Sequence, residues 1–232
     1  MPRAKMLPPH YLPLLFQFAR AHSQQPERDR CFIALSYYAA LRAQEIAFME
    51  LRDVTDAAGA LSDYIEVSAR AAKYGKPRSV PAIGELKDAL ATYLWKFPIQ
   101  AGPLFFSQSG QPMTPSGVAQ QLARIGRGAG FDVSSHSGRR TCLTLASQKA
   151  PFHDASLRDV QMLAGHSDIS TTQAYIEPSS RHSALLESLY QPLDREPIDV
   201  APLSILSPQD KGPGSADYFR RRNRFRKPTW TS

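Results

Sequence analysis

Three short segments, far apart in the chain, hold the polar side chains that a phosphodiester transfer without a metal ion needs. They are Ala40–Ile46 (ALRAQEI), His136–Thr141 (HSGRRT) and Leu163–Ile176 (LAGHSDISTTQAYI). Attack on a phosphodiester adds negative charge to its non-bridging oxygens, and planar guanidinium groups answer that charge with paired donors. Arg42 and Arg139 are therefore the candidates for stabilising the phosphate.

Together the three segments resemble the tyrosine recombinase, or phage integrase, family. In that family an Arg, a His-x-x-Arg pair, a Gly-His and a Tyr nine residues later meet at the scissile phosphate. The segment Ala72–Pro81 (AKYGKPRSVP) also resembles the family's lysine-bearing hairpin. The resemblance runs from about Pro8 to Tyr190. It implies binding of double-stranded DNA and an enzyme of DNA recombination and integration, of the kind that mobile genetic elements carry.

The resemblance and the chemistry together give each candidate residue a role. Tyr175 is expected to form a 3′-phosphotyrosine, because a phenol with a pKa of about 10 can form a phosphate ester and leave it again. His136 and His166 are expected to hydrogen-bond the phosphate or assist proton movement. Lys73 is expected to protonate the departing 5′ oxygen, with Lys76 as the alternative.

Two further expectations concern the surroundings of these residues. Glu45 lies one turn after Arg42 and, as the family pattern implies, is expected to orient its guanidinium group. No metal ion and no nucleotide cofactor is expected, because arginines supply the charge stabilisation and the phosphotyrosine conserves the bond energy. As in the family, we expect the chain to work as a homo-tetramer on DNA.

Several positions, Arg140 and Ala164 among them, depart from the family pattern without removing a candidate catalytic group, and two others concern the packing of helices. Ala40 stands where the family usually has Gly, and because it is still small we expect the helix packing to be kept. Gly138 stands where the family often has Leu, and a glycine there is expected to loosen the start of its helix.

Apolar periodicity predicts the elements that position these residues. A first helix is expected after Pro8-Pro9, and one long helix over Glu27–Glu50 carries Arg42 and Glu45. Short strands and turn residues predict an antiparallel meander of three strands at Leu51–Val54, Tyr64–Ser68 and Ser79–Ile83. Further helices are predicted at Glu85–Phe97, Thr114–Ala129, Ser137–Lys149, Leu157–Ala164, Ile169–Ile176 and Arg181–Tyr190.

The sequence predicts one domain followed by a tail. Residues 1–190 are expected to form a tyrosine recombinase catalytic domain, mainly α with a small antiparallel β-sheet (α+β). Residues 191–232 are rich in proline and are expected to be a flexible extension. The segment from Pro213 to the end carries +5 of the net charge of +7, which favours contact with DNA phosphates. Its basic residues are Arg220, Arg221, Arg222, Arg224, Arg226 and Lys227.

Composition excludes several other classes of protein. With 42% hydrophobic and 21% charged residues, the chain is typical of a globular domain. The two cysteines, Cys31 and Cys142, form no CxxC or Cys/His cluster that would indicate zinc, and both are expected to be reduced core thiols. No run approaches the roughly 18 apolar residues of a membrane span, so we expect a cytoplasmic protein.

Because Arg42 comes early in this sequence, we expect the chain to lack the N-terminal core-binding domain that integrases of the family generally carry. The layout is similar to that of short members such as the fimbrial phase-variation invertases. Three alternatives to a self-sufficient recombinase stay open. They are a type IB topoisomerase activity, a decayed integrase that acts as a DNA-binding or accessory module, and a domain that needs a separately encoded core-binding partner.

Overall fold

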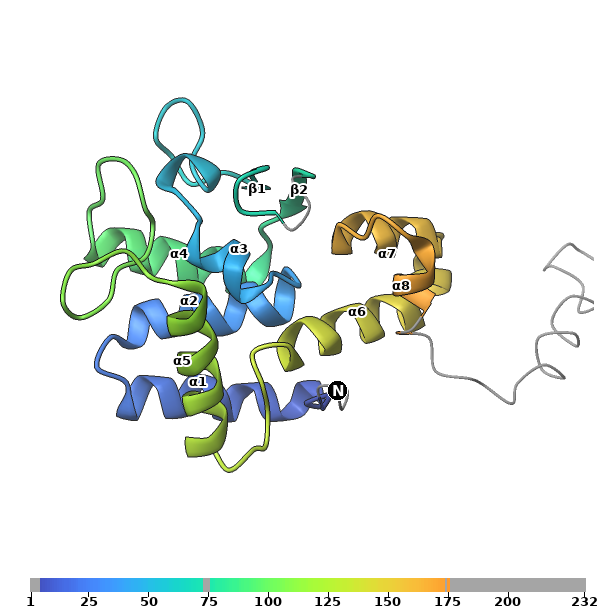
Figure 1. Cartoon of the computed structure of the whole chain (residues 1–232), viewed down its shortest axis with the longest axis horizontal. Coiled ribbons are helices and arrows are strands. Elements are labelled where there is room, and N and C mark those ends of the chain that lie inside the picture. The colour runs from blue at the N-terminus through green and yellow to red at the C-terminus, as the bar shows by residue number, and fades with distance from the viewer. Residues whose placement is uncertain (1–4, 73–75, 174, 176–232) are drawn as a thin grey trace, which may run out of the picture. The chain divides into compact units, whose positions relative to one another are not determined.

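The computed structural model describes residues 5–72, 76–173 and 175. Its fold is mainly helical with a small antiparallel sheet, as the sequence predicts (Figure 1). The strands are β1 (Tyr64–Val67) and β2 (Arg78–Pro81). The α-helices are α1 (Leu12–His22), α2 (Pro26–Tyr38), α3 (Ala43–Ala47), α4 (Gly84–Lys96), α5 (Pro115–Gly128), α6 (Ser137–Lys149), α7 (Leu157–Ala164) and α8 (Ile169–Gln173). Short 3-10 turns are η1 (Pro9–Tyr11), η2 (Leu51–Asp53) and η4 (Ala150–His153).

Helix α2 forms the centre of the main core. Nine of its 13 residues are buried, as expected for a helix that has neighbours on most of its faces. Helices α1, α4, α5 and α6 all contact it. Its Phe32 ring packs edge-on against Phe105 at a centroid distance of 5.1 Å. Because α2 is fixed from several sides, the residues that follow it have a rigid support.

A second, smaller apolar cluster joins α6 to α7. It contains Leu143 from α6, Val160 and Ala164 from α7, and Ala40 from the segment after α2, and Tyr175 packs against it. In Figure 1, α6 leads away from α1 and α5 toward α7 and α8. This cluster therefore brings all three segments of candidate residues together.

The single helix predicted over Glu27–Glu50 is wrong, because the chain breaks between α2 and α3. Ala40 has a left-handed backbone with φ of 53°, and the N–H of Leu41 donates back to the carbonyl of Leu35 at 3.1 Å. Apolar periodicity did not reveal the break, since α2 and α3 both bury side chains in the same core. Arg42 consequently precedes the first residue of α3 and is not on the surface of a long helix.

The predicted meander is also wrong in its first strand. In the described residues the sheet has two strands, with Ile65 opposite Val80 and Val67 opposite Arg78. Leu51–Asp53 instead forms the turn η2, and the N–H of Val54, the residue after it, donates to the Leu51 carbonyl at 3.1 Å. A hydrogen bond between residues i and i+3 is typical of a 3-10 turn. The apolar residues Leu51 and Val54 are therefore spaced for a 3-10 turn and not for a strand.

Gly138 has a packing role that the sequence did not indicate. Helix α6 spans Ser137–Lys149, as predicted, with the glycine in its first turn. A Cβ atom at this position would lie 2.2 Å from Ser36 Oγ and 2.8 Å from Tyr37 Cδ2 of α2. The glycine therefore allows α6 to approach α2 closely, and this contact fixes the start of α6.

The remaining predicted features divide between described and undescribed residues. Cys31 and Cys142 are both free, with Cys31 buried and Cys142 partly buried. Among the described residues no helix combines the length and the apolar character that a bilayer crossing needs. The predicted helix Arg181–Tyr190 and the basic tail lie outside the described residues. The boundary at residue 190 stays a prediction.

Candidate active site

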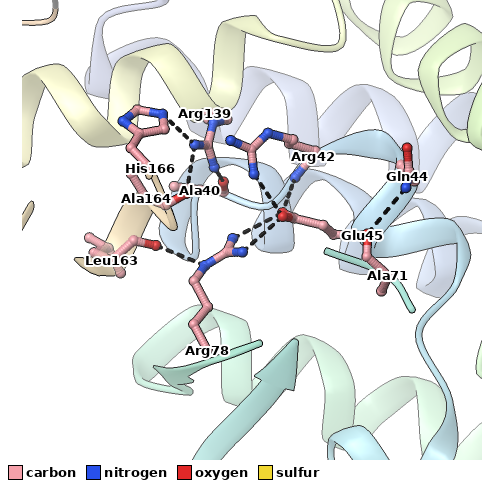
Figure 2. Close-up of polar contacts among 10 residues, drawn as sticks. All are labelled: Ala40, Arg42, Gln44, Glu45, Ala71, Arg78, Arg139, Leu163, Ala164 and His166. Atoms are coloured by element: carbon pink, nitrogen blue, oxygen red, sulfur yellow. Dashed lines mark hydrogen bonds and ion pairs between the residues drawn. The ribbon is translucent and has the colours of Figure 1, made fainter. Parts of the chain in front are cut away.

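The guanidinium group of Arg139 is buried in the first turn of α6. It donates to the carbonyl of Ala40, to the carbonyl of Ala164 at 2.8 Å, and to Nε2 of His166 at 2.9 Å (Figure 2). Burial, followed by the positive charge of Arg42, lowers the pKa of Arg139 to about 10. The group therefore stays charged at neutral pH, and its main-chain contacts fix its direction.

The carboxylate of Glu45 binds two arginines at once. Its Oε1 accepts from Nη1 of Arg42 and from Nη1 of Arg78, each at 2.8 Å. Its Oε2 accepts from Nη2 of Arg78 at 2.9 Å and from the backbone N–H of Arg42 at 2.8 Å. Burial alone would raise the pKa of Glu45, but these hydrogen bonds and the two positive charges lower it below its ordinary value. Glu45 is therefore ionised and fixes both guanidinium groups.

Sequence reasoning missed Arg78, which joins three elements of the site. It lies on β2, pairs with Glu45 of α3, and donates from Nε to the carbonyl of Leu163 in α7 at 3.0 Å. One signal for it was present. Arg78 lies two residues before the buried Val80, and side chains two apart point to the same face of a strand, so this arginine had to point inward.

The group made by these side chains attracts anions. The three guanidinium groups of Arg42, Arg78 and Arg139 exceed the single carboxylate of Glu45 by two positive charges. Arg42 is the more accessible partner of Glu45, with 18% of its side chain exposed against 7% for Arg78. Figure 2 shows Arg42 and Arg139 next to each other, with Glu45 between Arg42 and Arg78. The arrangement can bind a tetrahedral oxyanion that approaches Arg42 from the solvent.

The Gly-His dipeptide ends α7 and directs His166 toward Arg139. Gly165 caps the helix with φ of 61°, a left-handed conformation that glycine adopts without strain. The backbone N–H of His166 then donates to Gln161, whose side chain donates back to the His166 carbonyl at 3.0 Å. A Cβ atom at position 165 would lie 3.0 Å from Arg78, so the glycine also leaves room for that side chain.

Tyr175 and His166 lie face to face at the edge of this group. Their ring centroids are 5.8 Å apart with an interplanar angle of 20°, and Tyr175 is partly buried. Burial, followed by the positive charges of Arg139, Arg42 and Arg78, lowers the pKa of His166 from 6.5 to about 4. His166 is thus neutral at neutral pH.

The other predicted site residues are His136, Lys76, Lys73 and the basic residues of the tail. His136 is exposed and directly precedes α6, three residues before Arg139. Lys76 is exposed in the segment that leads into β2. Lys73 lies outside the described residues, and so do the six basic residues of the tail.

Comparison with known proteins shows the family of this chain. A profile of the phage integrase family matches residues 5–182. The tyrosine recombinase XerC of Rhodospirillum centenum is 31% identical over 186 residues, which cover 77% of this chain and 50% of that relative. XerA of Pyrococcus furiosus is 28% identical over 158 residues, 67% of this chain and 52% of that relative. The chain therefore spans about half the length of the curated relatives that it matches.

A solved structure shows the same fold. The Tn1549 transposon integrase in complex with circular intermediate DNA matches with a TM-score of 0.63 and 20% sequence identity. The match covers 82% of this chain and 67% of that one.

Proposed function

The chain belongs to the phage integrase family, and on that premise we propose that it cleaves and rejoins DNA at specific sites through a 3′-phosphotyrosine at Tyr175. The proposal extends to this chain the activity for which its relatives are named. Double-stranded DNA is the proposed partner, with strand exchange in a tetramer of this chain on DNA.

One series of contacts carries the proposal. The Tyr175 ring stacks on the His166 imidazole, and Nε2 of that imidazole lies 2.9 Å from the guanidinium of Arg139. A phenol that is to attack a phosphate must lie beside the cations that bind it, since a nucleophile acts only within reach of its target. Here the imidazole of His166 contacts both the phenol ring of Tyr175 and the positively charged guanidinium of Arg139.

The proposed step breaks one P–O bond and forms another. Tyr175 Oη attacks the phosphorus, the phenol loses its proton, and the bond from phosphorus to the 5′ oxygen breaks. Arg42 and Arg139 balance the charge that develops on the non-bridging oxygens. His136 and His166 are assigned to hydrogen-bonding or proton movement, and Lys73 to protonation of the 5′ oxygen. Rejoining reverses these changes, with a DNA hydroxyl as the attacking group.

The test is capture of the covalent intermediate on nicked DNA. The chain is incubated, in excess EDTA, with duplexes that carry a nick beside a randomised central segment, so that cleavage releases a short fragment and traps the adduct. We expect a protein–DNA adduct that survives denaturing electrophoresis and is absent with Tyr175→Phe. Tyr64→Phe is the matched control, because Tyr64 is an exposed tyrosine on β1.

Other outcomes of the same experiment separate the alternatives. An adduct that persists in Tyr175→Phe contradicts the assignment of the nucleophile. Retention of the duplexes without any adduct indicates a DNA-binding or accessory module. Relaxation of a supercoiled plasmid by the single chain, without exchange between two sites, indicates a type IB topoisomerase activity.

A further inference from the structure

Residues 68–77 connect β1 to β2, and this connection carries both lysines that are candidates for protonating the 5′ oxygen. The last pair of the two strands before the connection joins Val67 to Arg78. Lys76 lies two positions before Arg78 in the sequence, and Lys73 lies five positions before it. Because a chain spans at most about 3.5 Å per residue, the place of Arg78 limits where both lysines can lie.

The side chain of Arg78 fixes this end of the connection to two elements of the site (Figure 2). Its two Nη atoms bind the two oxygens of the Glu45 carboxylate on α3, and its Nε donates to the Leu163 carbonyl of α7 at 3.0 Å. Both side chains of the ion pair are buried. A buried guanidinium with three directed donors cannot shift without breaking charge-assisted hydrogen bonds. Strand β2 is therefore held at a fixed place beside α3 and α7.

Helix α3 also contacts the other end of the connection. The side-chain amide of Gln44 donates to the Ala71 carbonyl at 3.4 Å, a contact that Figure 2 shows. Arg70 donates to the carbonyl of Phe48, the residue that caps the end of α3, at 2.9 Å. Ala71 and Ala72 are both buried. The same short helix thus supports the connection before and after the position of the lysines.

We propose that Arg78 is a positioning residue for protonation of the 5′ oxygen: it fixes the connection that carries Lys73 and Lys76 on α3, the helix that begins directly after Arg42. This inference rests on the proposed function. In that reaction Arg42 binds the non-bridging oxygens of the phosphate whose 5′ oxygen receives the proton. A general acid acts only within hydrogen-bond reach of its target, so the acid and Arg42 need a common support.

The first test replaces the leaving oxygen by sulfur. The cleavage position is mapped on the nicked duplexes, and a second duplex then carries sulfur in place of the 5′ oxygen at that position. A thiol ionises with a pKa of about 8.5, so a thiolate leaves without a proton from the protein, whereas the 5′ oxygen of ordinary DNA needs one. Sulfur therefore rescues a defect in the placing of the acid and does not rescue a defect in phosphate binding.

Arg78→Met is expected to form adduct about 100-fold more slowly on the ordinary duplex, but within about fivefold of the wild-type rate on the sulfur duplex. Rates are corrected for the folded fraction. Arg78→Lys keeps the positive charge beside Glu45 without the paired donors, and should show the same pattern with a smaller loss. It decides the question if the methionine variant does not fold.

Two further variants give the reference patterns. Arg42→Ala should be slow on both duplexes, because it removes a group that binds the phosphate. Arg30→Met is the matched control, since Arg30 of α2 also binds a carboxylate through two nitrogens, that of Glu85 on α4, outside the candidate site. It should keep the wild-type rate on both duplexes.

The second test needs no DNA. Hydrogen exchange followed by mass spectrometry reads the peptides that cover the connection and β2. In Arg78→Met we expect residues 68–81 to exchange about tenfold faster than in the wild-type chain, because local opening of a segment becomes easier when its contacts are lost. Arg30→Met should leave the exchange of these residues unchanged.

Each outcome has a defined meaning. Equal slowing of Arg78→Met on the two duplexes overturns the proposal, because the arginine would then act through Arg42 or through general stability. A wild-type rate on the ordinary duplex, or unchanged exchange over residues 68–81, also overturns it. A wild-type chain that yields no adduct on either duplex refutes the proposed function instead, and the exchange rates still decide whether Arg78 holds the connection.

Discussion

The guanidinium group of Arg78 forms a paired contact with the carboxylate of Glu45, with its two Nη atoms at 2.8 and 2.9 Å from the two carboxylate oxygens. The pair is buried and connects β2 to the start of α3. A charge that loses its partner in such a place is costly, whereas an exposed ion pair contributes little. The first prediction follows from this difference.

Arg78→Met should lower the free energy of unfolding by about 3 kcal/mol, since Glu45 stays buried with only Arg42 to neutralise it. Urea unfolding followed by circular dichroism measures the loss. Arg52→Met is the control, because Arg52 pairs with Glu50 at the surface with 78% of its side chain exposed, and should cost less than about 1 kcal/mol. Equal losses in the two variants would contradict a special role for Arg78.

Gly138→Ala should destabilise the chain by about 2 kcal/mol or more, because the added methyl group enters space that Ser36 occupies. Removal of the opposing side chain in the double variant Ser36→Gly/Gly138→Ala should recover part of this loss. Gln148→Ala, at an exposed position of α6, is the control and should change stability by less than about 0.5 kcal/mol. A Gly138→Ala chain as stable as this control would mean that α6 can move away from α2 freely.

The stability of the chain should fall as the pH drops from about 6.5 toward 4, in part through His166. Burial and the nearby arginines hold the pKa of folded His166 at about 4, below its ordinary 6.5. Between these values the unfolded chain binds a proton that the folded chain does not, so acid favours unfolding. Urea unfolding at about pH 7 and pH 5 should show a loss about 1 kcal/mol larger in the wild type than in His166→Asn. The same loss in both chains would assign the effect to other groups.

Arg139→Lys should reduce the rate of adduct formation about 100-fold or more, since a single ammonium cannot reproduce the fixed donors of the guanidinium. The rate is measured on the nicked duplexes and corrected for the folded fraction. Arg140→Lys, the adjacent residue on α6, should stay close to the wild-type rate. Comparable slowing in both variants would argue that the general charge of α6, and not Arg139, supports the reaction.

Some elements could be predicted from the sequence to the residue. Helix α7 has the predicted bounds because both of its ends carry local signals. Ser156 accepts from the N–H of Asp159, whose carboxylate accepts from the Ser156 N–H, and Gly165 ends the helix in a left-handed conformation. Signals of this kind act within a few neighbouring residues, so they can be found without knowledge of the fold.

The break at Ala40 could not be found in this way. Alanine is the strongest helix former and rarely adopts a positive φ, so its presence indicates a continuing helix. The left-handed backbone at Ala40 explains why glycine is usual at this place in the family. The conformation is set by distant contacts, including the hydrogen bond from Arg139 to the Ala40 carbonyl, which no local pattern encodes.

The candidate site was only partly accessible to sequence reasoning for a similar reason. The role of Glu45 beside Arg42 was predicted from a spacing of three residues, and the two side chains do form an ion pair. Arg78 reaches the same carboxylate from 33 positions away, and Thr172 is buried against an imidazole that a short helix brings to it. Such partners are defined by packing, so they appear only when the chain is folded.

Because Arg139 binds the main chain at Ala40 and at Ala164, it joins two distant parts of the polypeptide as well as facing the site. Selection for a chain that merely folds would therefore preserve this arginine whether or not the chain performs the proposed strand cleavage. Among the described residues the phenolic oxygen of Tyr175 makes no comparable hydrogen bond to the main chain. Relaxed selection would therefore allow this tyrosine to be lost first. Among descendants of this gene, a retained tyrosine would thus be the better indicator of the proposed reaction, whereas a retained arginine would indicate only that the fold is kept.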